Sequence, residues 1–476
     1  MSAKITPRSA DFPRWYQEVV QQGDLAENSP VRGCMVIKPH GYALWENIKE
    51  PLDRMFKETG HENAYFPLFI PKSFIDREAD HVEGFSPELA IVTHGGGKLL
   101  EEPLVVRPTS ETVIGHMYSK WVQSHRDLPI LINQWANVVR WELRPRLFLR
   151  TTEFLWQEGH TVHATEAEAE QETLQMLEIY ARVAEDYLAI PVRQGLKSRI
   201  ETFPGALRTY CIEGLMQDGK ALQMGTSHNL GQNFAKAFDI QFQDVDGERK
   251  LAWTTSWGVS TRLVGAVVMA HGDDKGLVLP PRVAPVQVVL VPIFRKEEER
   301  AAVIAEASGI VERLKQAGVR AKLDDREQLK PGAKFFEWEK KGVPLRLELG
   351  PRDLADKQVV CVRRDDGSKT PLPILGIEAA LGDLLDEIQK SLFTRAAERT
   401  RAQTSRAGSM EEFERMLQEP GGFVAAPWDG TDESELAIKE RTKATIRIVL
   451  DEEAPEGACI LSGKPAKRMA LFARSY

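Results

Sequence analysis

The sequence predicts a multidomain α+β protein of 476 residues. At roughly 100–200 residues per domain, this length corresponds to two to four domains, with three as the central expectation. Residues 1–283 mix short apolar strands with a few helices in no repeated βα order, which is typical of an antiparallel α+β domain. The proline-rich stretch LVLPPRVAP (277–285) interrupts this pattern. We therefore place a domain boundary near residue 284.

Residues 284–397 are predicted to form a compact α/β domain with a mixed sheet. Its strands are VQVVLVPI, VRAKL and PLRLEL, with helices expected over 296–316, 335–341 and 377–399 and a hairpin at Asp366-Gly367. Residues 398–476 are predicted to form a third, small α+β unit. It begins in a charged helix over 397–418 and ends in the strands KATIRIVL and KRMALFARSY.

Composition and charge exclude several classes of protein. The formal net charge is −8, so a nucleic-acid partner would have to be bound by local basic patches. Four cysteines without a CxxC pair argue against a disulfide framework and a four-thiolate zinc site, and they favour a reducing compartment. The N-terminus lacks the apolar core of a signal peptide, and no apolar run of about 18 residues occurs. We therefore predict a soluble cytoplasmic protein without a membrane partner.

The densest polar cluster, residues 137–164, is interpreted as a two-stranded hairpin that turns near 145–147. Strand alternation would place side chains of each strand on a shared face: Arg140, Glu142 and Arg144 on one strand, and Arg150, Thr152, Phe154 and Trp156 on the other. Four arginines accompany one glutamate between residues 140 and 150, which leaves positive charge unpaired. Buried guanidinium groups need partners, so we favour a binding floor for an anion. The alternative is a solvated face with pairs such as Arg140–Glu142.

A second cluster, residues 251–281, predicts a strand that ends near Gly258 and a helix capped by Ser260 or Thr261. Arg262 lies in the first turn of this helix. Arginine there opposes the helix dipole, which favours anions, so a bound phosphate would explain it. The alternative is a surface arginine paired with Asp273 or Asp274. The run LVGAVVMA is apolar all round, which indicates a buried helix and favours a functional arginine.

Three further segments are weaker signals when taken alone. In residues 100–122, Thr109 or Ser110 with Glu111 is explained by a helix cap and a first-turn acid. Residues 220–238 place three polar side chains beside glycines: Gln223, Thr226 and His228. A lone histidine is more often structural than a ligand. HGGGK (94–98) lacks the spacing of a phosphate-binding loop and is interpreted as a flexible turn.

Taken in order, these blocks resemble the class II aminoacyl-tRNA synthetases, and specifically the prolyl-tRNA synthetases. The resemblance is carried by RPTSET, RWELRPRLFLRTTEFLWQEGHT, LQMGTSHNLGQNFAKAF and SWGVSTRLVGAVVMAHGDDKGLVLPPRVAP, and it covers essentially the whole chain. It implies a class II antiparallel-sheet catalytic domain (1–283), an α/β anticodon-binding domain (284–397) and a C-terminal domain (398–476). Residues 41–71 match the family's first motif, a helix and strand that imply a homodimer.

The resemblance also implies a two-step reaction, in which proline and ATP give prolyl-adenylate and the 3′-OH of the terminal adenosine of tRNA(Pro) then takes the prolyl group. Arg140 and Arg262 would be the catalytic residues, with Arg140 at the α-phosphate and Arg262 at the γ-phosphate. The positions that match ATP contacts are Arg140, Glu142, Arg150, Thr151, Gln223, Thr226, Ser260 and Arg262. Glu142 and Gln223 would also contact the Mg²⁺ that accompanies ATP.

For the amino acid, the matching positions are Thr109, Glu111, Arg140, Phe154, Trp156 and His228, with Phe203 as a further wall residue. Thr109 and Glu111 would accept the ammonium hydrogens. Fewer than a hundred residues separate His163 from Ser256, so the chain resembles the archaeal/eukaryote-like type without the bacterial editing insertion. In the anticodon-binding domain, the matching positions are Glu339, Arg346, Arg352 and Asp353. Residues 334–364 carry eight Lys/Arg and five Asp/Glu, a net charge of +3 that suits phosphate contact.

The C-terminal unit departs from the family pattern. Relatives of this type commonly carry a four-cysteine zinc site, whereas Cys459 here is accompanied by Asp429, Ser434 and Ser462. One thiolate does not make a structural zinc site, so we predict no zinc. The terminal Tyr476 is expected to support the active site, with a frayed tail as the alternative.

Two other functions compete with this one. The first is a synthetase for another small amino acid, such as threonine or serine. The second is a catalytically inactive synthetase-like protein that binds tRNA or a translation factor. Such a paralogue would be expected to have lost Arg140, Glu142 or Arg262, and all three are present.

Overall fold

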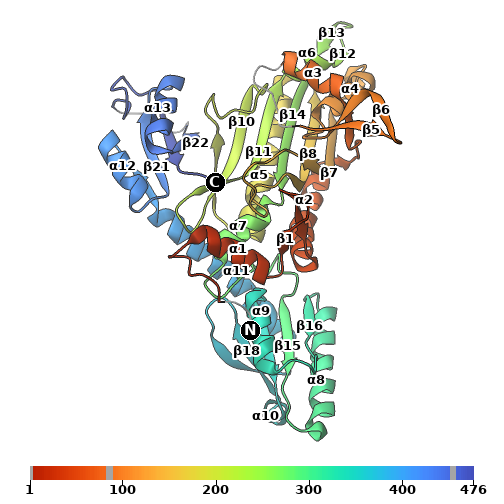
Figure 1. Cartoon of the computed structure of the whole chain (residues 1–476), viewed down its shortest axis with the longest axis vertical. Helices are drawn as coiled ribbons and strands as arrows, with labels where there is room; N and C mark the ends of the chain where they lie inside the picture. Colours follow the sequence, from red (N-terminus) through yellow and green to blue (C-terminus); the bar gives the residue numbers. More distant parts are fainter. Residues whose placement is uncertain (1–3, 82–88, 451–456) are drawn as a thin grey trace.

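The computed structural model describes residues 4–81, 89–450 and 457–476, which form three parts (Figure 1). A large twisted sheet with its helices forms the upper part, and an α/β domain lies below it. The C-terminal unit lies beside the large sheet, and the long helix α11 (Ile377–Ala402) leads to it from the lower domain. The mixture of helices and mainly antiparallel strands confirms the predicted α+β class.

The large sheet is antiparallel through its centre, in the order β9-β10-β11-β14-β8-β7, and β3 joins β7 in parallel. Its strands are β3 (Glu62–Asn63), β7 (Ile130–Val139), β8 (Glu153–His163), β9 (Val192–Leu196), β10 (Arg208–Leu215), β11 (Ala221–Gly231) and β14 (Trp253–Ser260). The helices of this part are α1 (Phe12–Gln22), α2 (Pro39–Glu58), α3 (Lys72–His81), α4 (Glu111–Trp121), α5 (Glu166–Arg182), α6 (Asn233–Phe238) and α7 (Arg262–His271), with short helical turns η1 (His125–Asp127) and η2 (Val183–Tyr187). This arrangement confirms the antiparallel sheet expected for residues 1–283.

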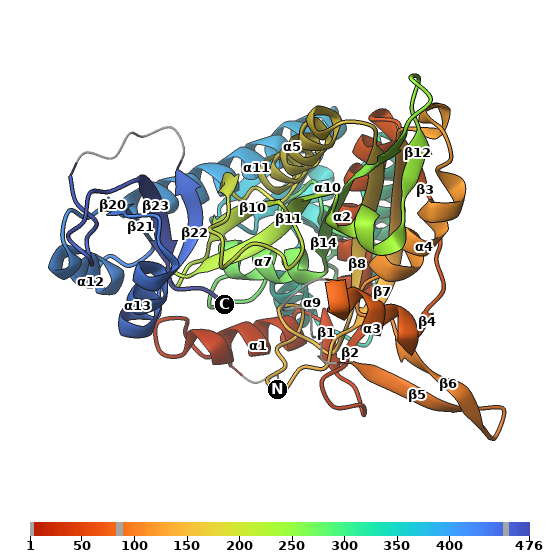
Figure 2. The same cartoon turned by 90° about the horizontal axis from the view of Figure 1, so that it is seen from above.

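Three small sheets flank the large one. Their strands are β1 (Ala26–Asn28) with β2 (Met35–Ile37), β4 (Phe69–Pro71) with β6 (Lys98–Val106) and β5 (Ala90–Gly95), and β12 (Gln241–Gln243) with β13 (Arg249–Leu251). The hairpin β5–β6 projects away from the body in the view from above (Figure 2). HGGGK forms its turn, where Gly96 and Gly97 both have positive φ.

Helices α5 and α7 both pack against the central strands β11 and β14. The sequence of each helix accounts for its position. Helix α5 begins with a capping box, in which the Thr165 hydroxyl accepts from Glu168 N and the Glu168 carboxylate accepts from Thr165 N. Helix α7 is buried at every position from Leu263 to Ala270, as its all-apolar sequence predicts. Arg262 is thereby fixed at the first turn of a helix that is buried in the core.

The predicted hairpin over 137–164 is present and turns around the predicted residues, but its two strands end earlier than expected. Strand β7 ends at Val139 and β8 begins at Glu153, so residues 140–152 form a long connection. The predicted alternation of Arg140, Glu142 and Arg144 therefore does not hold. The connection folds inward because Leu147, Phe148 and Leu149 enter the hydrophobic core of the upper part. Burial of these three apolar side chains outweighs continuation of the strand pairing.

The lower domain has the predicted mixed sheet, in the order β16-β15-β17-β18-β19. Strand β15 pairs in parallel with both β16 and β17, whereas β17, β18 and β19 are antiparallel. The elements are β15 (Val288–Pro292), α8 (Glu297–Gln316), β16 (Ala321–Leu323), α9 (Pro331–Lys340), β17 (Leu345–Leu349), α10 (Pro351–Ala355), β18 (Gln358–Arg363) and β19 (Lys369–Pro373). Gly367 has positive φ in the turn between β18 and β19, as the Asp-Gly signal indicates.

The C-terminal unit contains β20 (Thr404–Arg406), α12 (Met410–Gln418), β21 (Phe423–Trp428), α13 (Asp432–Thr442), β22 (Thr445–Leu450) and β23 (Arg468–Ala473). The single helix predicted over 397–418 is wrong. Helix α11 ends at Ala402, strand β20 pairs with β21, and α12 begins after Ser409, whose hydroxyl accepts from Glu412 N. A new cap and a strand pairing thus divide a continuous charged segment.

The strands of the C-terminal unit extend the large sheet. The order β20-β21-β23-β22 continues into β9, where Val449 pairs with Leu196. The chain end also joins the large sheet, since Ser475 bridges to Ala221 of β11 and Tyr476 N donates to Ala221 O over 3.3 Å. Helices long and apolar enough to cross a membrane are absent from the described residues.

Candidate active site

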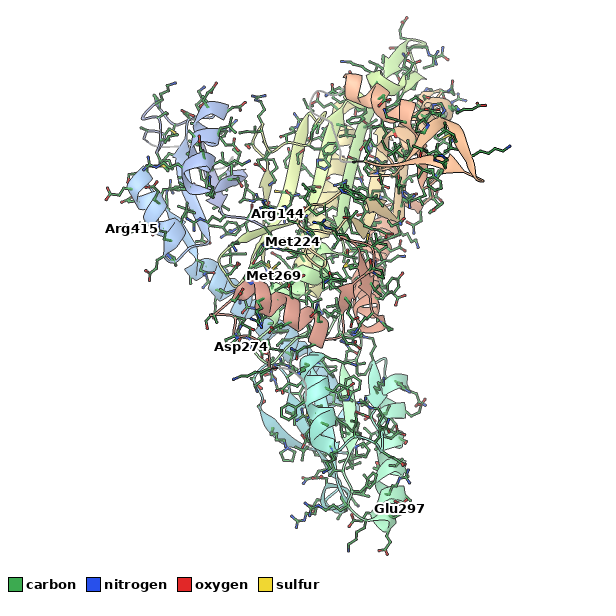
Figure 3. The ribbon with its side chains drawn as sticks, viewed as in Figure 1. Arg144, Met224, Met269, Asp274, Glu297 and Arg415 are labelled. Carbon is green, nitrogen blue, oxygen red and sulfur yellow. The ribbon has the colours of Figure 1, made fainter. Side chains whose placement is uncertain are left out.

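A cavity with a volume of about 620 Å³ opens over strands β8, β11 and β14. Met224 of β11, which lines it, is labelled near the centre of Figure 3. The cavity lining includes every nucleotide and amino-acid position singled out in the sequence: Thr109, Glu111, Arg140, Glu142, Arg150, Thr151, Phe154, Trp156, Phe203, Gln223, Thr226, His228, Ser260 and Arg262. These residues come from segments more than 150 positions apart, and the antiparallel sheet brings them together.

Two arginines carry unneutralised positive charge into this cavity. The Arg140 guanidinium donates to Pro108 O over 3.0 Å and lies 5.1 Å from the ring centre of Trp156. Arg262 donates to the backbone oxygens of Leu149 and Gln223, each over 3.3 Å. In the described part of the chain, neither guanidinium forms an ion pair with a carboxylate. Guanidinium groups bound only by carbonyl oxygens keep their full charge for an anion.

The electrostatics agree with this geometry. Burial, together with the positive charges of Arg150 and Arg140, lowers the pKa of Arg262 to about 10. Burial likewise lowers the pKa of Arg140, and the Glu158 carboxylate opposes that shift. Both groups stay protonated at neutral pH. Their mutual repulsion is relieved when an anion enters the cavity.

At the end of the cavity beside helix α4, the lining carries carboxylates instead of arginines. The Glu158 carboxylate accepts from Ser110 N over 3.0 Å, from the Ser110 hydroxyl over 2.6 Å and from the Gln134 amide over 2.8 Å. His160 Nε2 lies 3.1 Å from Glu158, and its Nδ1 lies 3.7 Å from Glu111. Ser110 therefore binds Glu158 rather than capping its own helix, and Glu111 faces the cavity from the first turn of α4.

The pKa values of His160 and Glu158 are shifted in opposite directions. Burial by itself would lower the pKa of His160, but the Glu111 and Glu158 carboxylates raise it to about 10. Burial would raise the pKa of Glu158, but His160 and Ser110 lower it to about 2. Two carboxylates and one imidazolium leave a net charge of −1 at neutral pH. That charge complements a single ammonium group.

Sequence analysis missed Glu158 and His160. Both lie on β8, at positions i+2 and i+4 from Trp156, so they share its face of the strand. The alternation that placed Phe154 and Trp156 together would have found them if continued along the strand. Both side chains are more than nine-tenths buried. A buried pair of opposite charge facing a cavity is a stronger functional signal than either residue alone.

Aromatic side chains wall the space between the two ends. The rings of Phe154 and Trp156 meet edge to face with their centres 6.0 Å apart. Across the cavity, Phe203 lies against His228, with ring centres 4.7 Å apart. Burial, with the charges of His160 and Arg140, lowers the pKa of His228 to about 3, so its ring is neutral. The rings of this wall are thus uncharged on both sides.

Oxygen ligands lie near the arginines. Glu142 accepts from Arg144 N over 2.8 Å, and its second oxygen lies 3.7 Å from Arg150 Nε. Glu142 and Gln223 line the same cavity. The described residues hold no group of three or more His, Cys, Asp or Glu side chains that would bind a metal by themselves. One carboxylate and one amide fit Mg²⁺, which keeps several waters and takes further oxygens from substrate phosphates.

Comparison with known proteins agrees with these features. Residues 98–271 match the tRNA synthetase class II core domain (G, H, P, S and T), residues 287–391 match an anticodon binding domain, and residues 410–476 match the prolyl-tRNA synthetase C-terminal domain. The proline–tRNA ligase of Porphyromonas gingivalis is 56% identical, with 99% of both chains covered. The proline–tRNA ligases of Chlorobium limicola and Cytophaga hutchinsonii are 57% and 54% identical over 100% of both chains.

The chain belongs to the prolyl-tRNA synthetase family. It contains a class II core domain, an anticodon-binding domain and the C-terminal domain of that family.

The positions expected to read the anticodon are spread over the lower domain. Glu339, in the last turn of α9, lies 3.3 Å from Lys275 of the catalytic part. Arg346 on β17 pairs with Glu348 over 2.8 Å and lies 4.2 Å from the ring centre of Phe335. Asp353 accepts from Gly350 N over 2.8 Å, and Arg352 is exposed. Arg346 and Glu348 share one face of the strand, where Lys369 also pairs with Glu348 over 2.8 Å.

Most of the basic side chains among residues 334–364 have partners within the protein. Lys334 donates to Asp324 O, Lys341 pairs with Asp24 and Glu337, and Arg363 pairs with Asp365 and Glu387. Arg364 forms a double hydrogen bond to Asp273 of the catalytic part, at 2.6 and 2.7 Å. A count of charges along the sequence does not show such partners. Lys341 and Arg364 therefore join the two domains, and Lys334 and Arg363 bind partners within the lower domain. These side chains stabilise the fold more than they offer a phosphate-binding surface.

Asp429, Ser434 and Ser462, which the resemblance matched to cysteines, form one hydrogen-bonded cluster around the Asp429 carboxylate. Asp429 accepts from the hydroxyls of Ser434 and Ser462, each over 2.6 Å, and from the Thr431 hydroxyl over 2.8 Å. Burial would raise the pKa of Asp429, but these hydrogen bonds hold it well below its usual range. Cys459 is buried in the apolar core of the unit. Hydrogen bonds to Asp429 thus connect the start of α13 with the segment that contains Ser462.

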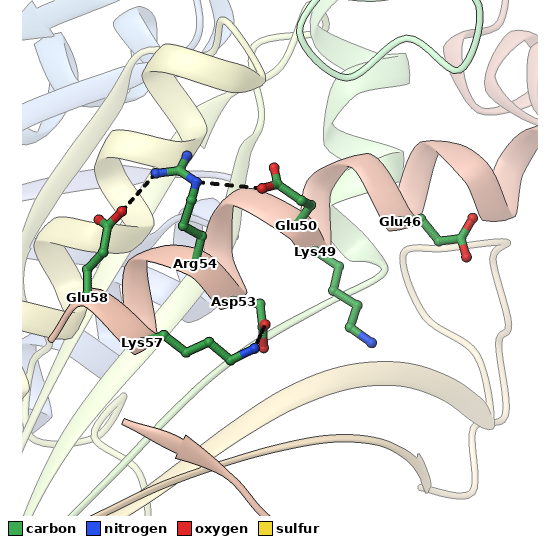
Figure 4. A pocket seen from close by; sticks show the side chains of 7 residues that line it. All are labelled: Glu46, Lys49, Glu50, Asp53, Arg54, Lys57 and Glu58. Carbon is green, nitrogen blue, oxygen red and sulfur yellow. Dashed lines mark hydrogen bonds and ion pairs between the residues drawn. The ribbon is translucent and has the colours of Figure 1, made fainter. Parts of the chain in front are cut away.

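A second hollow, of about 590 Å³, lies along the exposed side of α2 (Figure 4). Its lining is one charged helix face, in which Arg54 lies between Glu50 at 3.5 Å and Glu58 at 3.1 Å, and Lys57 pairs with Asp53 at 2.6 Å. Its charges are paired along the helix, unlike those of Arg140 and Arg262. We therefore assign the chemistry to the first cavity.

Proposed function

We propose that this chain attaches L-proline to tRNA(Pro) at the expense of ATP, through a prolyl-adenylate. The observation that carries the proposal is one cavity with complementary ends. Its lining holds the unneutralised guanidinium groups of Arg140 and Arg262, and also the net negative cluster of Glu111, Glu158 and His160. A zwitterionic amino acid beside a polyphosphate matches this distribution of charge.

In the first step, a proline carboxylate oxygen attacks the α-phosphorus of ATP, a P–O bond forms, and pyrophosphate leaves. Arg140 lies between the two ends of the charged lining, where it would bind both the attacking carboxylate and the α-phosphate. Arg262 would hold the leaving end of the triphosphate. Arg150, Thr151, Thr226 and Ser260 complete the nucleotide contacts. Positioned charge of this kind supplies most of the rate enhancement in such transfers.

In the second step, the 3′-OH of the terminal adenosine attacks the prolyl carbonyl carbon, and AMP leaves. Arg140 stays beside the phosphate that becomes the leaving group. Its guanidinium would stabilise the charge that develops there, because it is already positioned beside the leaving phosphate.

Recognition of proline follows from its shape. Glu111 and Thr109 would accept the two hydrogens of the secondary ammonium, with Glu158 and His160 holding Glu111 in place. Phe154, Trp156, Phe203 and His228 would enclose the apolar ring. A hydrophobic pocket discriminates against a missing methylene by only about 1–3 kcal/mol, so alanine is expected to be activated at a reduced rate.

Bound Mg²⁺ would supply charge neutralisation to the phosphates. Glu142 and Gln223 would hold it through their side-chain oxygens, with water completing the shell. The proposal includes no zinc, because the hydrogen-bonded Asp429 cluster occupies the positions of the expected ligands.

Three further parts of the proposal concern partners. Glu339, Arg346, Arg352 and Asp353 would contact the anticodon of tRNA(Pro). Residues 41–71 would form a homodimer interface, which is supported by three exposed aromatic side chains in this segment: Tyr42, Tyr65 and Phe69. Because tRNA is aminoacylated in the compartment where translation uses it, we place the enzyme in the cytoplasm. The domain boundaries near 284 and 398 stay as predicted from the sequence.

Amino-acid-dependent exchange of pyrophosphate into ATP tests the activity. Proline is expected to give the highest kcat/KM, alanine a lower value, and threonine and serine none above background. Transfer to tRNA(Pro) is then measured with labelled proline. Exchange that depends on threonine or serine, or no exchange with any amino acid, would contradict the proposal.

A further inference from the structure

The loop between β9 and β10, residues 197–207, belongs to the amino-acid end of the cavity. Glu201, Phe203 and Pro204 line the cavity from this loop. Phe203 N donates to the Thr209 hydroxyl over 2.9 Å, and that hydroxyl lies 2.9 Å from His228 Nδ1. The contact between the Phe203 and His228 rings therefore depends on the path of the loop.

Helix α13 of the C-terminal unit binds the first half of this loop at three successive places. The Ser198 hydroxyl donates to Glu435 Oε1 over 2.6 Å, and each of these two residues is only 2% exposed. Arg199 Nε donates to Asp432 Oδ1 over 3.2 Å. Lys439 Nζ lies 3.5 Å from Glu201 Oε1. Glu201 is thus held by α13 on one side and lines the cavity on the other.

The strand before the loop is joined to the same unit. Val449 of β22 pairs with Leu196, the last residue of β9. The next residue, Lys197, binds Glu213 over 3.0 Å, and Glu213 accepts from Arg447 of β22 over 2.7 Å. Residues 196–199 and 201 therefore contact the C-terminal unit directly or through Glu213. A unit that only extended the sheet would not need contacts with the loop beyond it.

We propose that helix α13 is part of the amino-acid specificity apparatus: Asp432, Glu435 and Lys439 are positioning residues that hold the 197–207 loop so that Phe203 closes the wall against His228. The inference rests on the function proposed above. It gives the C-terminal unit a role that does not require zinc. Since α13 contacts the loop of the amino-acid end, its loss affects amino-acid binding more than nucleotide binding.

The test uses the full-length chain in pyrophosphate exchange, with KM measured separately for proline and for ATP. Arg199→Ala and Ser198→Ala remove loop-side atoms and leave α13 unchanged, and Lys439→Ala removes an exposed side chain from α13. Each is expected to raise the KM for proline about threefold to tenfold and to leave the KM for ATP within twofold. The ratio of kcat/KM for proline to that for alanine is expected to fall, because a loosened wall no longer fits the ring closely.

Glu440→Gln is the matched control, since Glu440 is exposed on the same helix. It is expected to leave both KM values unchanged. A double-mutant cycle of Ser198→Ala with Glu435→Ala separates positioning from general destabilisation. If the hydrogen bond carries the effect, the double variant raises the KM for proline no more than the larger single variant does.

Three results would overturn the inference. The first is an unchanged KM for proline in folded Ser198→Ala and Arg199→Ala. The second is an equal rise in the KM for ATP, and the third is additive effects in the cycle. If Glu435→Ala does not fold, the loop-side variants decide the question alone. Absence of proline-dependent exchange in the unmodified chain would count against the proposed function instead.

Discussion

Two regions of this molecule hold arginine in different ways: an open cavity, where Arg140 is exposed and Arg262 is half-buried, and a buried joint between two parts of the fold. In the cavity, Arg140 and Arg262 are held by backbone oxygens and have no carboxylate partner among the described residues. At the joint between the catalytic and C-terminal parts, Arg447 and Lys197 both bind Glu213, which is completely buried. Burial would raise the pKa of Glu213, but the two cations hold it below its usual value.

The difference separates binding from assembly. A buried cation with a buried carboxylate partner is electrostatically satisfied, so it joins parts of the fold. A partly exposed cation held only by carbonyl groups stays available for an anionic ligand. The same residue type therefore has a different role in each region, and the partner identifies that role.

The largest expected effect comes from removing a cavity arginine. Arg140→Ala is expected to lower the rate of proline-dependent pyrophosphate exchange by about 10³-fold, because a preorganised charge at the reacting phosphate is lost. Thermal unfolding is expected to stay close to that of the unmodified chain, since no buried partner is left unpaired. Unchanged exchange activity would remove Arg140 from its proposed role.

The matching change at the joint acts on stability. Arg447→Ala is expected to lower the free energy of unfolding by about 3–5 kcal/mol, because one partner of a buried ion pair is removed. Denaturant unfolding measures this loss. If Arg447→Ala proved no more destabilising than Arg140→Ala, the distinction between the cavity arginine and the buried, ion-paired arginine would fail.

A carboxyl at the same joint predicts a pH dependence. Burial raises the pKa of Glu435 to about 7, although Ser198 opposes the shift. The folded state therefore binds this proton more tightly than the unfolded state, whose carboxyl has a pKa near 4.5. Its contribution to stability is present below pH 4.5 and declines as the pH rises to 7, by on the order of 3 kcal/mol.

Glu435→Gln removes that dependence. The difference in unfolding free energy between this variant and the unmodified chain is expected to shift in favour of the variant between pH 4.5 and pH 7. Chemical unfolding at several pH values measures it. A difference that does not change with pH would mean that Glu435 titrates normally.

The Asp429 cluster predicts a smaller effect on stability. Asp429→Asn is expected to lower the unfolding free energy by about 2 kcal/mol, because hydrogen bonds to a buried carboxylate are weakened. A zinc chelator is expected to leave the melting temperature of the unmodified chain unchanged. One equivalent of zinc per purified chain, measured by atomic absorption, would contradict the no-zinc proposal.

The smallest expected effect concerns the negative end of the cavity. Glu158→Gln removes one of the two carboxylates that raise the pKa of His160, so that pKa is expected to fall below 10. The cluster loses its net negative charge, and the KM for proline is expected to rise about tenfold, which corresponds to about 1.4 kcal/mol. The KM for ATP serves as the internal control. Equal changes in both constants would place Glu158 outside amino-acid binding.

Local patterns were sufficient for many elements. The apolar run after Arg262 predicted a buried helix, and the Asp366-Gly367 dipeptide predicted a hairpin turn. The same reasoning failed over residues 140–152 and 397–418. In the first case, distant core contacts of Leu147 to Leu149 decided the path. In the second, pairing of β20 with β21 interrupted a segment whose own residues favour a helix.

By itself, the sequence determined the fold class, the family and the residues that carry charge and aromatic surface, because these depend on composition, periodicity and long motifs. Only the tertiary structure decided which charges are free. Arg140 and Arg364 look alike in the sequence, yet the first faces the cavity and the second binds Asp273. The energy of a buried charge depends on its partners, and the partners are brought together only by folding.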